Sequence, residues 1–236
     1  MDGKKIKFDK HLLERMRKNL NRTIFLNNVS GGFDCGLDNY GIMRDTIGNF
    51  TCQLSSGLYV AEGECGTGGW ALSTLISGKN KIMQGDIGVD GQRADINQLK
   101  KLSCYVGEDA ELKKIFGLKP MSVSEQINYG IAKGWSFAVK ADEIKERFGL
   151  SDERFNRPFH RISGERWRAS MAIGYAMGKF IYCFPWMNSI LITQLENCLK
   201  KCLPNLLEIG AIIIIPTTRH EVVENITEKY EIIKLH

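Results

Sequence analysis

The sequence predicts an α/β protein with a mostly parallel sheet and helices on both faces, together with an antiparallel β layer and an inserted helical subdomain. Three observations carry this prediction. After residue 163, short β-branched runs alternate with helix-forming segments, which is typical of parallel sheets. At residues 58–76 a strand, a glycine-rich loop and a helix-compatible run follow one another. Between residues 108 and 160, charged helix-forming stretches lie among loops, which indicates the helical insertion.

The composition is that of an ordinary globular protein. With 236 residues, 43% hydrophobic and 25% charged, one domain or one core with a subdomain is expected, and disorder is excluded for most of the chain. The seven cysteines are odd in number and form no CxxC pair, so neither a disulfide framework nor a structural zinc site is predicted. Because the N-terminus is charged, no secretory signal is predicted. The most apolar stretch, residues 171–192, is interrupted by polar residues, so no membrane span is predicted. A reducing cytosol fits these features.

The net charge of +5 is concentrated at the N-terminus. Residues 1–22 carry eight basic and three acidic side chains, and the other 214 residues hold 24 of each sign. A uniformly basic surface for nucleic acid is therefore not expected. Apolar residues at helical spacing within 4–20 predict a basic amphipathic helix, in an N-terminal segment 1–21 separate from the body. This helix either docks on the body or meets a partner or an anionic membrane surface.

The first half of the chain predicts the antiparallel layer and the central strand. Short β-branched segments are separated by turns rich in glycine and serine, and the expected strands are 22–29, 50–54 and 58–61. The last of these leads into the glycine-rich loop at 63–69, and a helix-compatible run follows it. This arrangement presents backbone N–H groups and a helix N-terminus to phosphates.

The remaining elements follow from local pattern in the same way. A hairpin is expected at 81–90 and a strand at 102–106. In the helical insertion, helices are expected at 122–129 and 141–148. After Ser163 the expected elements alternate: a long helix to about residue 177, strand 180–184, helix 190–202, strand 211–215, helix 220–226 and strand 230–235.

Four landmarks, read in order, resemble the nucleotide-binding domain of ATP-binding cassette (ABC) transporters. The loop GECGTGGW at 63–70 is similar to the phosphate-binding Walker A loop, GxxGxGK[ST], and GDIGVDG at 85–91 is similar to the hairpin that follows it in the family. CYVGED at 104–109 resembles the glutamine loop, and SVSEQINYG follows it as the family's TVxENIxYG does.

The third and fourth landmarks lie in the second half. Ser163-Gly164 at the start of a long helix resembles the signature motif LSGGQ, and the run IIII with His220 and EIIKL after it resembles the last strand, switch histidine and closing strand. One glycine loop matches by chance often, whereas four landmarks in the right order are specific. The resemblance implies a P-loop NTPase (RecA-like) ABC ATPase core over residues 22–236, with the helical subdomain at about 108–165.

The phosphate-binding loop departs from the family where its chemistry lies. The degenerate loop comprises Gly63, Glu64, Cys65, Gly66, Thr67, Gly68, Gly69 and Trp70. The family's lysine falls at Gly69 and its magnesium-binding hydroxyl at Trp70, so both functional groups are absent. A lysine about 4 Å from a phosphate is worth roughly 1 to 4 kcal/mol. The amides of 66–69 still offer an anion cradle, so no cofactor is assigned with certainty, and ATP without functional magnesium coordination stays open.

The acidic residues that the family uses for hydrolysis are also missing. Its acidic pair should lie within FIYCFPWMNS at 180–189, on Cys183-Phe184 or on Phe184-Pro185 depending on the register, and neither choice supplies a carboxylate. General-base catalysis is typically worth about 10² to 10⁴ in rate. No catalytic residue and no metal ligand is therefore assigned. The glutamine of the glutamine loop becomes Glu108, whose carboxylate either binds a cation or, left unpaired, repels phosphates.

The remaining motif positions either have two possible interpretations or match the ABC motif only in part. His220 either occupies the switch position or is an ordinary helix-start residue, and Tyr40 either stacks on adenine or is a surface tyrosine. In the signature, Ser163 and Gly164 match but Glu165 replaces the second glycine. In this family the signature completes the nucleotide site of the partner subunit.

The resemblance implies a catalytically degenerate nucleotide-binding subunit of an ABC transporter, with an exporter as the expected type. Its implied partners are a competent second ABC ATPase subunit and transmembrane permease subunits, and its implied place is the cytoplasmic face of the membrane. One alternative is a regulatory or scaffold protein that uses the fold for protein contacts, and another is a weakly active ABC ATPase. A dinucleotide-dependent oxidoreductase is disfavoured, because Ala71 stands where GxGxxG needs its third glycine.

Overall fold

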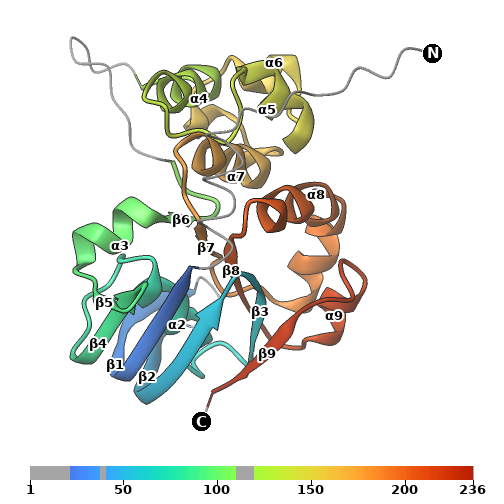
Figure 1. The fold of residues 1–236 in the computed structure, drawn as a ribbon. Helices are drawn as coiled ribbons and strands as arrows, with labels where there is room; N and C mark the ends of the chain where they lie inside the picture. The colour runs from blue at the N-terminus through green and yellow to red at the C-terminus, as the bar shows by residue number, and fades with distance from the viewer. Residues whose placement is uncertain (1–21, 38–40, 110–119, 236) are drawn as a thin grey trace.

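The computed structural model describes residues 22–37, 41–109 and 120–235. The predicted N-terminal helix at 4–20 and the candidate adenine-stacking residue Tyr40 lie outside these residues. The described residues form two sheets with a helical lobe above them, which confirms the predicted α/β class (Figure 1).

The antiparallel sheet has the strand order β2-β1-β4-β5. Its members are β1 (Thr23–Leu37), β2 (Gly41–Ser55), β4 (Gln84–Val89) and β5 (Gln92–Arg93). The long strands β1 and β2 run well beyond the segments predicted for them, because the glycines at 31–32 continue the strand instead of turning it. The hairpin predicted at 81–90 is present but displaced: its arms are β4 and β5, the turn between them comes at Asp90-Gly91, and β4 also pairs with β1.

The parallel sheet has the order β6-β7-β8-β3-β9 and confirms the predicted parallel core. Its members are β3 (Gly57–Glu62), β6 (Ser103–Tyr105), β7 (Ile181–Cys183), β8 (Ile212–Thr217) and β9 (Glu231–Lys234). β3, which leads into the glycine-rich loop, lies between β8 and β9. Because parallel strands end at the same edge, this order brings the loop beside the ends of β7 and β8.

Helix α2 (Gly69–Ile76) lies between the two sheets (Figure 1). Its apolar side chains share one core with the inner faces of both sheets, and this core includes Leu72 and Leu75. Helix α3 (Ile96–Leu102) was not predicted, although Asp95 and Gln98 form a capping box that marks its start. The local signal was present, but the helix is short and carries little apolar periodicity.

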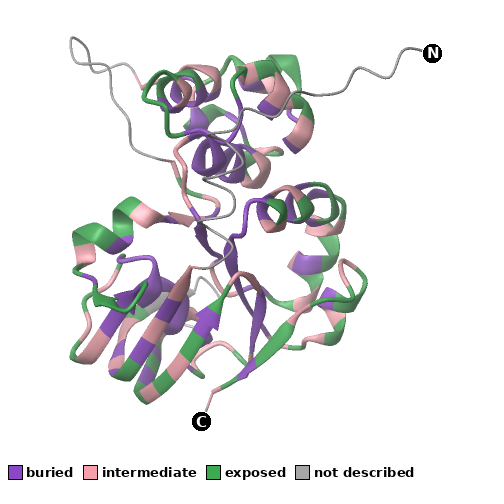
Figure 2. Ribbon diagram, viewed as in Figure 1, coloured by how far each residue is buried: buried purple, intermediate pink, exposed green. Residues whose placement is uncertain are grey.

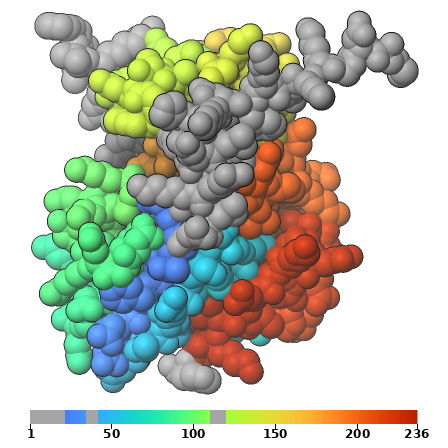
Figure 3. All heavy atoms as spheres, viewed as in Figure 1, coloured from blue at the N-terminus to red at the C-terminus, as the bar shows by residue number. Residues whose placement is uncertain are grey.

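The helical insertion forms a lobe above the sheets, as predicted, drawn yellow-green at the top of Figure 3. It contains α4 (Val123–Ala132), α5 (Ala141–Phe148), α6 (Asp152–Phe155) and the short 3₁₀ helix η1 (Phe159–Arg161). The predicted long helix α7 (Arg166–Ala176) follows, and its buried residues Met171 and Tyr175 belong to the core on the other face of the parallel sheet.

Helices α8 (Ser189–Glu208) and α9 (Glu221–Glu224) complete the second face. α8 is longer than predicted, because Pro204 lies inside the helix instead of ending it. The central strands β7 and β8 are wholly buried and β3 is buried except at its two ends (Figure 2), as expected for strands covered on both faces, whereas the edge strand β9 is mostly exposed. Among the described residues, no helix has the length and apolarity needed to cross a bilayer.

Candidate functional site

The glycine-rich loop joins a strand to a helix as the sequence predicts. β3 ends at Glu62 and α2 begins at Gly69. Gly66 and Gly68 have φ values of 98° and 97°, in the left-handed region that favours glycine. The left-handed conformation at these two glycines bends the backbone so that amide N–H groups face one side of the loop. This is the geometry of an anion cradle.

A carboxylate of the chain itself already occupies this cradle. Asp45, in β2, is fully buried. Its Oδ2 accepts a hydrogen bond from the N–H of Gly66 at 2.8 Å, and its Oδ1 accepts one from the N–H of Ala71, in the first turn of α2, at 2.7 Å. The sequence analysis missed Asp45, because it falls between two predicted strands and no local pattern links it to the loop.

The position predicted for the loop lysine has little room for a side chain. A Cβ placed on Gly69 would lie 3.3 Å from both the Ala61 carbonyl oxygen and Pro216 Cβ, and 3.4 Å from a Leu235 methyl. Such contacts are tighter than ordinary van der Waals packing, so a larger residue would require its neighbours to move. The glycine is thus part of the packing of α2 on β3 and β8.

Trp70 stands at the position predicted for the metal-binding hydroxyl, and aromatic neighbours hold its indole. Its Nε1 donates to the Tyr105 hydroxyl at 2.7 Å. The Phe33 ring meets it edge to face, with centroids 5.1 Å apart and an interplanar angle of 88°. Burial raises the pKa of Tyr105 well above its ordinary value, so this hydroxyl stays protonated. Phe33 is a second residue that the sequence analysis did not single out.

A cleft of about 380 Å³ opens beside Trp70, between the sheets and the start of α7. Aromatic side chains and two cations line it: Phe33, Trp70, Tyr105, Trp167, Lys79 and Arg166. Arg166 Nε donates to the Gly107 carbonyl oxygen at 2.6 Å. The place where family resemblance puts phosphate and metal is therefore largely apolar in this chain.

Glu108, at the glutamine-loop position, forms an ion pair with Lys79. Of the two roles left open by the sequence, an unpaired carboxylate does not apply, because Lys79 follows α2 closely in the sequence and the fold returns it to this loop. The Glu108 backbone oxygen also accepts a hydrogen bond from Ser170 Oγ at 3.0 Å. The loop is thereby tied to both α2 and α7.

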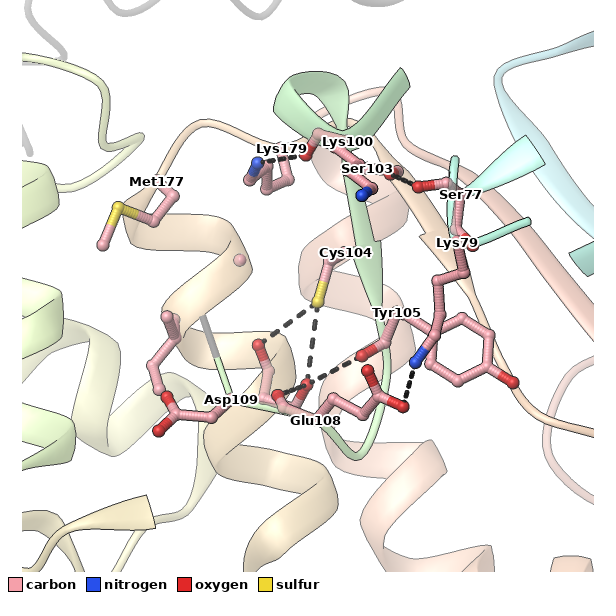
Figure 4. A pocket seen from close by; sticks show the side chains of 13 residues that line it. Ser77, Lys79, Lys100, Ser103, Cys104, Tyr105, Glu108, Asp109, Met177 and Lys179 are labelled. Carbon is pink, nitrogen blue, oxygen red and sulfur yellow. Dashed lines mark hydrogen bonds and ion pairs between the residues drawn. The ribbon is translucent and has the colours of Figure 1, made fainter. Parts of the chain in front are cut away.

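Behind Glu108 lies a second cavity of about 350 Å³, shown in Figure 4. The Cys104 thiol points toward the Ser170 carbonyl oxygen at 3.5 Å, and burial raises the pKa of this thiol to about 11. Lys179 Nζ donates to the backbone oxygens of Lys100 and Lys101 at 2.8 and 2.7 Å, and burial lowers its pKa. The thiol is thus a weak nucleophile, and the amine is engaged in closing the cavity.

The strand end predicted to carry the acidic pair is packed with aromatic side chains. β7 ends at Cys183, and the buried Phe184 stacks on Trp167 with centroids 6.1 Å apart. Trp186 Nε1 donates to the Gly63 carbonyl oxygen at 3.0 Å, and Ser73 Oγ donates to the Phe184 carbonyl oxygen. These bonds fasten β7 to the loop and α2, at the positions where the family has carboxylates.

His220 lies just after β8, beside the start of the loop. Its Nδ1 is 2.8 Å from Glu62 Oε1, and its backbone N–H donates to the same oxygen at 3.0 Å. Glu221 lies 4.0 Å from the ring nitrogen, and ligand atoms of the three residues fall within 4.8 Å of one another, close enough to share a metal ion. The hydrogen bond that the imidazole donates to Glu62 raises the pKa of His220, and the same contact lowers the pKa of Glu62.

We expect the Glu62→Gln substitution to lower the pKa of His220 toward its ordinary value, because the amide removes the charged acceptor. Both wild-type groups are ionised between about pH 4.3 and 6.5. The pair's contribution to stability is full in that window; it is lost as the pH rises through the raised His220 pKa or falls through the lowered Glu62 pKa. A proton NMR titration of the imidazole, assigned with His220→Asn, measures the shift. An unchanged His220 titration in Glu62→Gln would contradict the pairing.

The predicted signature lies at the exposed start of α7. Ser163 and Gly164 are both exposed, and a Cβ placed on Gly164 would meet nothing within 4 Å. Glu165, which replaces the second glycine, accepts a hydrogen bond from the N–H of Ser151 at 2.9 Å. This contact holds the turn against the start of α6 and leaves Ser163-Gly164 facing outward.

The residues of the loop do not fit a nucleoside triphosphate with its magnesium ion. Asp45 bonds the Gly66 and Ala71 amides, Gly69 leaves little room for a side chain, and Trp70 stands in the place of the metal ligand. Of the sequence-predicted residues, the fold brings Gly63–Trp70, Glu108 and His220 around one region. The additional residues Asp45, Phe33 and Glu62 complete that region with contacts inside the protein.

Similarity to other proteins is found in the three-dimensional structure and not in the sequence. No protein-family sequence model and no curated protein sequence matches the chain. A solved structure described as a dimeric post-hydrolysis state of an ATP-binding cassette with ADP and Pi superposes with a TM-score of 0.58, at 18% identity, over 90% of this chain and 94% of that one. The chain has the fold of an ABC nucleotide-binding domain.

Two further structures show how widely this ABC fold is shared. CbiO1 from Clostridium perfringens, described as part of the ABC transporter complex CbiONQ, matches over 90% of this chain and 84% of its own at 16% identity and a TM-score of 0.58. A bacterial Atm1-family ABC exporter with ATP bound matches over 92% of this chain and 37% of its own, at 15% identity and a TM-score of 0.59. The ABC fold predicted from the four sequence landmarks is thus confirmed.

Proposed function

We propose that this protein is a catalytically degenerate nucleotide-binding subunit of an ABC transporter, an exporter in our preferred version. It pairs with a second, competent ABC ATPase and rests on permease subunits at the cytoplasmic face of the membrane. The structurally similar proteins described as cassettes of transporters support this role. No step of hydrolysis is assigned to the chain's own loop.

One observation supports the proposal: the glycine-rich loop region is filled by the chain's own side chains, whereas the signature residues are exposed. The loop region is filled from within by Asp45 and Trp70. The signature residues Ser163 and Gly164 remain exposed at the start of α7, with open space around the glycine. A subunit with this combination can still present a serine hydroxyl and backbone groups to ATP held by its partner, while its own site takes no part in turnover.

Co-purification from native membranes, combined with ATPase assays, tests this function. We expect a permease and an ATPase with complete motifs to come down with the tagged full chain, and the chain alone to turn over ATP well below about 1 per second, the low end for enzymes. Turnover above that rate by the chain alone would contradict the degenerate role. Recovery of the chain without any permease would instead favour the regulatory or scaffold function.

A further inference from the structure

One amide of the glycine-rich loop and one in the first turn of α2 are bonded to an anion that belongs to the same chain. The carboxylate of Asp45 bridges Gly66 N–H and Ala71 N–H at 2.8 and 2.7 Å. Loop amides and the first turn of a helix together form a site that favours negative charge. A fully buried carboxylate with one amide on each oxygen satisfies that site as one edge of a phosphate would.

The backbone of β2 covers the loop on the same side. A Cβ placed on Gly68 would lie 2.8 Å from the Thr46 carbonyl oxygen, and one placed on Gly66 would lie 3.4 Å from the Arg44 carbonyl oxygen. The strand thus passes directly over the two left-handed glycines. The backbone on either side of Asp45 is therefore packed against the loop that the carboxylate contacts.

The β1–β2 hairpin is held in this place by its own contacts. Gly32 in β1 pairs with Thr46, and a Cβ on Gly32 would lie 2.2 Å from the Asp45 carbonyl oxygen, so only glycine allows the strands to approach this closely. On the exposed side, Arg44 Nε donates to Asp34 Oδ1 at 3.0 Å. Two independent features, the tight pairing and the ion pair, flank Asp45 in the hairpin.

We propose that Asp45 is an internal anion that closes the glycine-rich loop and excludes nucleotide phosphates from it. The negative charge has two effects. It occupies two amides, one in the loop and one in the first turn of α2, and it repels a phosphate brought within a few ångströms in a buried setting. The loop keeps its cradle conformation without any ligand. This inference goes beyond the proposed function, since it concerns the isolated chain and requires no partner.

Removal of the carboxylate should convert the loop into an anion site. We expect the full chain with Asp45→Ala to bind sodium pyrophosphate, and ATP without magnesium, at least tenfold more tightly than wild type in isothermal titration calorimetry. The matched control is Asp142→Ala, which removes an exposed carboxylate in the first turn of α5, in the helical lobe and outside the β1–β2 hairpin. Equal affinities in wild type and a folded Asp45→Ala variant would overturn the proposal, as would an equal gain in Asp142→Ala.

Hydrogen exchange of the wild-type chain tests the same contact without any substitution, and so covers the case in which Asp45→Ala does not fold. We expect the Gly66 and Ala71 amides to be protected in buffer free of phosphate and sulfate, with no added protection when pyrophosphate is present. Rapid exchange of both amides that slows only with pyrophosphate would show a loop that takes an external anion, and would overturn the proposal. Because neither measurement involves the complex, they can fail independently of the transporter assignment.

Discussion

Replacing Ser163 by arginine is expected to lower ATP hydrolysis by the assembled transporter complex at least a hundredfold. Under the proposed function, Ser163 and Gly164 close over ATP bound to the partner, and loss of one preorganised hydrogen-bond donor at a developing charge typically costs about 10² to 10³ in rate. The arginine also adds bulk at an exposed turn where Gly164 leaves open space. The measurement is steady-state ATPase activity of the purified complex in lipid.

The matched control for this prediction is Asn97→Arg. Asn97 is exposed on α3, outside the helical lobe that carries the signature, so the variant adds the same side chain without touching the turn. We expect the control complex to assemble and to keep its activity. Wild-type hydrolysis by the complex with Ser163→Arg would show that the signature of this chain takes no part in the partner's site.

Substituting Trp70 by alanine is expected to destabilise the protein by about 3 kcal/mol. Deletion of a packed tryptophan typically costs roughly 3 to 5 kcal/mol, and a partly exposed indole falls at the lower end. The change removes the edge-to-face contact with Phe33 and leaves the Tyr105 hydroxyl without its indole donor. Urea unfolding followed by circular dichroism gives the free energy of unfolding.

Trp135→Ala is the matched control for the Trp70 variant. Trp135 lies in the helical lobe after α4, and its side chain is 44% exposed, with an edge-to-face contact to Tyr129. A loss of about 1 kcal/mol or less is expected there. Similar losses in the two variants would mean that Trp70 does not stabilise the loop region by filling the position of the metal ligand.

Much of the fold was predictable, because its signals are local. The alternation after Ser163 predicted β7, α8, β8 and β9 in order, since buried parallel strands consist of continuous apolar runs. Boundaries were less accurate where a local rule was overridden. Pro204 sits inside α8, and the glycines at 31–32 extend β1 instead of turning it. In both places tertiary packing outweighs the intrinsic preference of the residue.

The candidate site was only half predictable. The positions of Gly69, Trp70 and Glu108 follow from motif order along the chain, and the structure places all three around the loop. Their partners do not follow, because Asp45, Phe33 and Lys79 reach the site through strand pairing or a turn that the sequence does not mark. The pairing of Glu108 with Lys79 could therefore not be chosen in advance, whereas the missing functional groups were visible in the sequence.

By itself the sequence determined which groups this protein lacks: no lysine at 69, no hydroxyl at 70 and no carboxylate within 180–189. A side chain that is not encoded cannot be supplied by folding. Only the tertiary structure decided what stands in their place, namely the Asp45 carboxylate on the loop amides and the indole of Trp70 between Phe33 and Tyr105. The physical reason is that motif spacing reports neighbours along the chain, whereas these contacts join α2 and its loop to β1, β2 and β6, which are distant in sequence.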